Sequence, residues 1–81
     1  MTLEFSPHFL RNYHKSPVAI QRAFDKQVLL LLDNPRHPSL RAKKYDESRD
    51  LWQARVTSSW RFYFKIEGDV YRLQAITPHP K

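Results

Sequence analysis

The spacing of the apolar residues changes along this chain from the period of a helix to the period of a strand, and this change constrains the fold most. Residues 17–33 carry apolar side chains about every 3.6 residues, which is typical of an amphipathic helix. From residue 51 onward, apolar and polar residues alternate, as in strands with one buried face. The sequence therefore predicts helices first and a sheet after them.

Two Ser-Pro pairs mark the starts of two helices. Serine is a favoured N-cap and proline is favoured at the first helical position. Ser6-Pro7 therefore predicts a short helix to about His14, and Ser16-Pro17 predicts a longer one that ends before Asn34-Pro35. The apolar stripe of the longer helix consists of Ile20, Phe24, Val28 and Leu31.

Four strands are expected, one before the helices and three after them. The first is the alternating segment Leu3-Glu4-Phe5, and the others are residues 51–57, 60–67 and 70–77. A two-residue turn at Gly68-Asp69 would pair Phe64 with Leu73 and Phe62 with Ala75. The Ser58-Ser59 connection needs a bulge or an odd loop to bring Val56 beside Trp60 or Phe62 on the apolar face.

These elements predict one α+β domain over residues 1–81. A small antiparallel sheet, built from three C-terminal strands plus a short N-terminal strand, would carry the two N-terminal helices on one face. The expected core is Trp52, Val56, Phe62, Phe64, Tyr71 and Leu73 against the helical stripe.

Composition narrows the functional classes. There is no cysteine, which excludes disulfides and thiolate metal sites. No apolar run approaches the roughly 20 residues of a membrane span, and no signal peptide follows Met1, so we expect a cytoplasmic protein without a membrane partner. Fourteen Lys and Arg against eight Asp and Glu give a formal charge of +6, which favours a polyanionic partner.

The second face of the predicted sheet is basic, aromatic and polar, and we expect no acidic residue to neutralise it. It consists of Gln53, Arg55, Arg61, Tyr63, Lys65, Arg72 and Gln74. The turn at Gly68-Asp69 would place Lys65 directly opposite Arg72, and this arrangement is unfavourable because both side chains are positively charged. Two interpretations follow: a solvated outer face, or a phosphate-binding platform on which Tyr63 stacks against a base.

Such a face could support RNA cleavage by the 2′-hydroxyl of the substrate, which needs a proton acceptor, a proton donor and cations but no metal. Arg55 and Arg61 suit the cationic role because one guanidinium can donate to two phosphate oxygens at the same time. His79 is the histidine nearest this sheet in sequence, and imidazole is a common proton donor and acceptor in catalysis, although a solvated tail residue is the alternative. The other histidines are expected at the surface or as caps. No metal-ligand spacing or nucleotide-binding fingerprint occurs, so we expect no metal and no cofactor.

Five segments show a characteristic order and spacing over nearly the whole chain. They are Leu3-Glu4-Phe5-Ser6, Ser16-Pro17 with Ile20-Gln21, Asn34-Pro35-Arg36-His37-Pro38-Ser39-Leu40 leading to Lys43-Lys44, Leu51-Trp52-Gln53-Ala54-Arg55-Val56, and Trp60-Arg61-Phe62-Tyr63-Phe64. Together they resemble the RelE/ParE superfamily of bacterial type II toxins. That family has a small antiparallel sheet with two helices packed on one face.

The resemblance implies a ribosome-dependent mRNA endonuclease that an antitoxin protein neutralises. It implies catalytic roles for Arg55, Arg61 and His79, and the same sheet face offers Gln53, Tyr63, Lys65 and Arg72 for RNA binding. The sequence departs from the family at Gln53, where many of its nucleases carry a basic residue, and in residues 77–81, which lack the aspartate or tyrosine of various members. Two alternatives stay open: a ParE-like inhibitor of DNA gyrase, and a basic binding module without nuclease activity.

Overall fold

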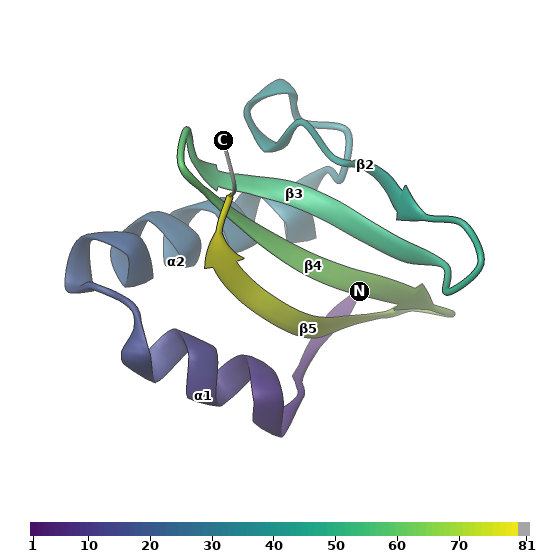
Figure 1. Cartoon of the computed structure of the whole chain (residues 1–81). Helices are drawn as coiled ribbons and strands as arrows, with labels where there is room; N and C mark the ends of the chain where they lie inside the picture. Colours follow the sequence, from purple (N-terminus) through teal and green to yellow (C-terminus); the bar gives the residue numbers. More distant parts are fainter. Residues whose placement is uncertain (80–81) are drawn as a thin grey trace.

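The computed structural model describes residues 1–79, which form two α-helices, one short 3₁₀ helix and five strands (Figure 1). The helices are α1 (Pro7–Lys15), α2 (Val18–Asp33) and the 3₁₀ helix η1 (Pro38–Leu40). The strands are β1 (Thr2–Phe5), β2 (Lys43–Asp46), β3 (Leu51–Thr57), β4 (Trp60–Glu67) and β5 (Val70–Pro78). The α+β class and the positions of both helices are confirmed.

The sheet differs from the expected one in strand number and direction. Its order is β1-β5-β4-β3-β2, with β1 parallel to β5 and the other neighbours antiparallel, so it is a mixed five-stranded sheet. The prediction missed β2 because this strand lies at the edge of the sheet. Its side chains are exposed or only half-buried, so its sequence shows no apolar alternation.

The hairpin of β4 and β5 contains a bulge that the alternating pattern did not reveal. Its turn at Gly68, with φ of +60°, pairs Phe64 with Leu73 as expected. Beyond that pair the register shifts by one residue, so Phe62 lies opposite Ile76 and the predicted pairing with Ala75 is wrong. The shift turns Ile76 into the core, where its exposed fraction is 2%.

The hairpin of β3 and β4 also contains a bulge, and this one was expected. Arg55 lies opposite Arg61, and Thr57 lies opposite Trp60, so the register shifts across Val56. Val56 itself is buried in the core, but it has no paired residue on β4. The bulge keeps the apolar residues before and after it on the same side of the sheet.

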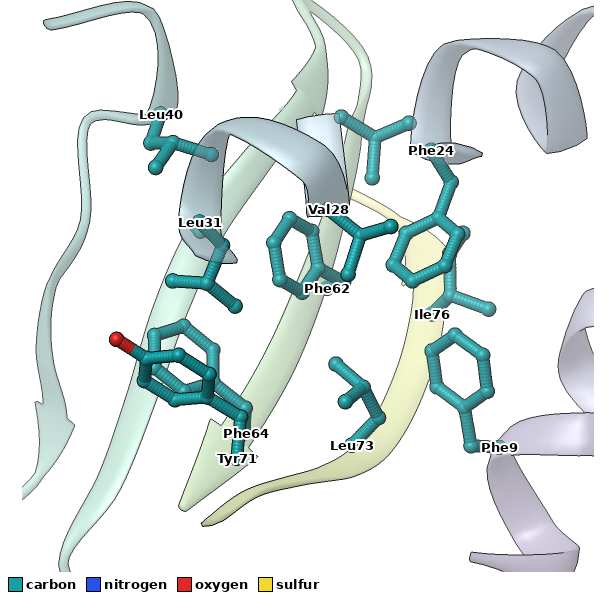
Figure 2. Close-up of a cluster of buried hydrophobic side chains, with 12 residues drawn as sticks. Phe9, Phe24, Val28, Leu31, Leu40, Phe62, Phe64, Tyr71, Leu73 and Ile76 are labelled. Carbon is teal, nitrogen blue, oxygen red and sulfur yellow. The ribbon is translucent and has the colours of Figure 1, made fainter. Parts of the chain in front are cut away.

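The core lies between the sheet and the two helices, where aromatic rings meet (Figure 2). The ring of Phe24 lies 5.1 Å from that of Phe9 and 5.2 Å from that of Phe62, measured between centroids. The predicted core is confirmed apart from Trp52 and Ile20, which are only half-buried. Phe9, Leu40, Ala54 and Ile76 also belong to the buried cluster.

Helix α1 lies along the edge of β5 beyond the point where β1 ends. The backbone N–H of Ser6 donates to the carbonyl of Leu73 (3.0 Å), and its hydroxyl donates to the carbonyl of Gln74 (3.2 Å) while capping the helix. Phe9 of this helix faces the core, where its exposed fraction is 1%. Within residues 1–79, neither helix is long and apolar enough to cross a membrane.

Candidate nucleic-acid interface

The three predicted catalytic residues lie at one end of the sheet, around the turn between β3 and β4. Arg55 and Arg61 are cross-strand partners, and Arg61 also pairs with Thr77 of β5. His79 follows two residues later, and its backbone N–H donates to the carbonyl of Ser59 in the turn (2.7 Å). The fold thus brings together residues that are far apart in the sequence. Residues 80 and 81 of the terminal segment lie outside the described residues.

The two arginines face each other without a carboxylate between them. In the described part of the chain, neither Arg55 nor Arg61 forms an ion pair. One guanidinium nitrogen of Arg61 donates to the carbonyls of Thr57 (2.6 Å) and Trp60 (2.9 Å), which holds the side chain at the turn. Because like charges directly opposite on a sheet are destabilising, this pair would gain from an anion bound between the two strands.

Gln53 holds an aromatic side chain at the centre of the same face. Gln53 is only 5% exposed, and its amide donates to the phenolic oxygen of Tyr63 (3.1 Å). The ring of Tyr45 meets the ring of Tyr63 edge to face, with centroids 5.1 Å apart. Gln53 is therefore placed to orient Tyr63, whereas Tyr63 and the more exposed Tyr45 offer aromatic surface to a ligand.

A groove of about 630 Å³ lies over this half of the polar face. Tyr63, Lys65, Gln74 and Ala75 line its sheet side. One wall is the first part of α1 with the residue that caps it, and the other is formed by β2 and the start of β3. The wall residues are Ser6, Pro7, His8 and Arg11 on one side and Tyr45, Arg49 and Leu51 on the other. The aromatic and cationic side chains of the groove thus come from four segments, which are α1, β2, the turn between β2 and β3, and β4.

Sequence reasoning missed four aromatic or basic residues of this groove. They are His8, Arg11, Tyr45 and Arg49. His8 and Arg11 are three residues apart on the helix and so lie on one side of it, which the sequence could have indicated. Nothing in the sequence places that side beside β4, because this depends on how α1 packs against β5.

The prediction that no acidic residue neutralises this face is wrong at Arg72. Lys65 and Arg72 are opposite each other as expected, but the Arg72 guanidinium pairs with Glu4 and with Glu67, each at 2.9 Å. Glu4 reaches it because β1 pairs with β5 in parallel and places Glu4 beside Arg72. Lys65 forms no ion pair within residues 1–79, so the positive charge there belongs to Lys65.

The turn between β2 and β3 fixes the position of Arg49 at the groove. The Asp46 carboxylate accepts hydrogen bonds from the Ser48 hydroxyl (2.7 Å) and from the Arg49 guanidinium (2.8 Å). These bonds stabilise the charged form and lower the pKa of Asp46 to about 2. Arg49 is therefore partly neutralised, and Arg11 and Lys65 carry the uncompensated charge of the groove.

The remaining histidines are a helix cap or surface residues, as expected from the sequence. The Nδ1 atom of His37 accepts from the backbone N–H of Ser39 (3.2 Å) and caps η1. His8 and His14 are exposed. Among residues 1–79, no group of three or more His, Asp or Glu side chains is arranged to hold a metal ion.

Comparison with solved structures identifies the fold as that of bacterial and archaeal type II toxins. The YoeB/ParE toxin from Agrobacterium tumefaciens matches 99% of this chain and 100% of its own, with a TM-score of 0.82 and 13% identity. The isolated RelE toxin of E. coli matches 99% of this chain and 85% of its own, with a TM-score of 0.77 and 16% identity.

A third similar structure is the archaeal RelE–RelB complex from Pyrococcus horikoshii, with a TM-score of 0.80 and 16% identity over 99% of this chain and 96% of that one. No protein-family model and no curated protein shows a significant match to the sequence. The chain therefore has the RelE/ParE toxin fold, as its sequence segments predicted.

Proposed function

We propose that this protein is the toxin of a type II toxin–antitoxin pair and that it cleaves mRNA on the ribosome in the cytoplasm. The single observation that carries the proposal is the uncompensated pair Arg55–Arg61 with His79 at the same end of the sheet. A fold shared with RelE and YoeB/ParE toxins supports it. The arrangement supplies cations and a titratable group in one place, which is what cleavage by the 2′-hydroxyl needs.

In this mechanism the 2′-oxygen attacks the adjacent phosphorus and the 5′-oxygen of the next nucleotide leaves. Arg55 and Arg61 stabilise the charge that develops on the phosphate oxygens, each through paired N–H donors. His79 exchanges a proton with one of the substrate oxygens. The leaving 5′-oxygen takes up a proton, so the products are a 2′,3′-cyclic phosphate and a free 5′-hydroxyl, and hydrolysis of the cyclic ester by water gives a 3′-phosphate end.

The groove would hold the neighbouring nucleotides. Lys65 lies four residues beyond Arg61 on β4, so the two Cα atoms are about 13 Å apart at the usual rise of a strand. That span accommodates a phosphate at each end and an unstacked base between them. Tyr63, oriented by Gln53, provides a surface on which the base stacks, a contact commonly worth about 1–3 kcal/mol.

The partner would be an antitoxin protein that covers the polar face with an acidic segment. The formal charge of +6 and the free cations Arg55, Arg61 and Lys65 favour such a segment. The structural relatives include a RelE–RelB complex, which shows that this fold accommodates a protein partner in another organism. We expect the antitoxin to suppress the toxicity of the chain.

The test is primer extension on mRNA in a translating extract. We expect the wild-type protein to cut, Arg61→Ala to cut about 10²–10³-fold more slowly, and His79→Ala to cut about 10²–10⁴-fold more slowly. Arg22→Ala and His14→Ala are matched controls, because both residues are exposed on the helices and should not affect cleavage.

Full cleavage by Arg61→Ala would remove the phosphate role of this arginine. Full cleavage by His79→Ala would show that another group carries the proton. If the wild-type protein arrests growth without cutting mRNA, the gyrase-type alternative takes the place of the nuclease, and supercoiling of DNA by gyrase becomes the measurement.

A further inference from the structure

A second depression, of about 490 Å³, lies between α2, η1 and the end of β3. Three cations line it: Lys26 of α2, Arg41 directly after η1, and Arg55 of β3. The polar groups around them come from Gln27, Ser39 and Thr57. Arg55 belongs both to this depression and to the Arg55–Arg61 pair, so the two basic regions are continuous.

No acidic side chain of the described residues lines this depression. Within residues 1–79, none of Lys26, Arg41 and Arg55 forms an ion pair, whereas Lys44, Arg49 and Arg72 elsewhere on the surface do. Three cationic residues around one depression raise the local potential and attract an anion.

The backbone around the depression is held in place by specific contacts. Gln27 is only 8% exposed, and its amide nitrogen donates to the carbonyls of Arg55 (2.8 Å) and Ser39 (3.2 Å). Arg41 has a φ of +46°, a left-handed conformation that glycine or asparagine adopts more easily. Glycine would adopt this backbone conformation without strain but would bring no side chain. Arginine at this position adds a positive charge to the lining of the depression.

We propose that Lys26 and Arg41 form a phosphate-binding site for the backbone of single-stranded RNA, continuing the path of the strand past Arg55. The proposal rests on the nucleic-acid binding of the proposed function, but it does not depend on cleavage. Phosphate contacts fix the position of a strand without reading its sequence, so this site would hold RNA in register at the Arg55–Arg61 pair. Charge complementarity favours a phosphate backbone, because three cationic residues without an acidic partner line the depression and one of them, Arg55, also belongs to the pair proposed to bind the scissile phosphate.

The salt dependence of RNA binding tests this site directly. The probe is an oligouridylate of about 12 nucleotides, and its binding is measured by fluorescence anisotropy between about 50 and 200 mM salt without ribosomes. The test variant is Lys26→Gln/Arg41→Gln. The control variant, Lys15→Gln/Arg22→Gln, removes the same charge from exposed helical positions outside both basic regions.

We expect the test variant to lower the slope of log affinity against log salt by about 0.7 for each of the two lost contacts. A slope of about 0.7 means that each contact strengthens binding about fivefold when the salt concentration falls from 1 M to 0.1 M, and the variant would lose this gain. The single variant Lys26→Gln should lose about half as much slope as the double variant. The control should keep the wild-type slope.

A test variant that keeps the slope of the control would overturn the proposal, even if primer extension confirms the nuclease. A lowered slope would support the site even if the wild-type protein cleaves nothing. Deca-glutamate is the second probe. If it binds wild type with the affinity of the RNA and loses affinity to the same extent in the test variant, the site recognises acidic protein segments and the commitment to RNA is wrong.

Discussion

Replacement of Gln27 by leucine tests how the sheet and α2 are joined beside the arginine pair. Gln27 is nearly buried on α2, and its amide nitrogen donates to the carbonyls of Arg55 and Ser39. The bulge across Val56 disrupts the β3–β4 ladder next to Arg55, and the Gln27 amide supplies a donor there. Leucine has a similar volume, so it removes the donor while keeping the space filled.

The expected cost follows from the carbonyl that loses its partner. A buried polar group left without a hydrogen bond costs about 1–3 kcal/mol. Ser39 is exposed, so water can replace the bond to its carbonyl, and most of the cost arises at Arg55. We therefore expect Gln27→Leu to lower the free energy of unfolding by about 2 kcal/mol, a large share of the roughly 4–12 kcal/mol expected for a chain of this size.

Urea denaturation followed by circular dichroism measures this change. With a slope near 1 kcal/mol per molar for so small a chain, the midpoint should fall by about 2 M. Amide exchange at residues 55–57 should also become faster, because α2 no longer holds the bulge. Arg22→Leu, at an exposed position of the same helix, should change stability by less than about 0.5 kcal/mol. A Gln27→Leu midpoint equal to that of the control would refute the reasoning.

Two further predictions concern the core and the turn beside the groove. Phe64→Ala should cost about 3–5 kcal/mol in chemical denaturation, because the ring is 1% exposed and packs against three other aromatic rings; a loss below about 1 kcal/mol would contradict the placement. For Asp46, hydrogen bonds from Ser48 and Arg49 lower the pKa to about 2 in the folded protein. The stability that wild type gains over Asp46→Asn should therefore be complete above about pH 4 and disappear as the pH falls through about 2. An equal difference at about pH 6 and pH 2 would show that the carboxylate is not held in this way.

Local patterns predicted most of the elements because each depends on neighbouring residues. The Ser6-Pro7 pair begins α1 through a cap that the serine side chain makes within its own first turn. The alternation in β3 and β4 predicted both strands, because it follows from the geometry of any half-buried strand. Strand β2 escaped the same reasoning, since an edge strand with few buried side chains needs no apolar alternation.

The same local reasoning predicted only part of the candidate site. The outward positions of β3 and β4 follow from the same alternation, so Arg55, Arg61, Tyr63 and Lys65 were found on one face. The pairing of Arg72 with Glu4 was not predicted. These residues are 68 positions apart in the sequence and meet only because β1 pairs in parallel with β5. The groove residues from α1 and from the turn between β2 and β3 were not predicted for the same reason.

The sequence by itself determined the positions of both helices and of the three C-terminal strands, the buried side of β3 and β4 and the excess of positive charge. These properties arise from periodicity and composition, which act locally or on the whole chain. Only the tertiary structure decided which cations stay free, which bulge turns Ile76 inward, and that Lys26 and Arg41 converge on Arg55. Each of these depends on contacts between distant segments, and such contacts are selected by the packing of the whole core rather than by any local pattern.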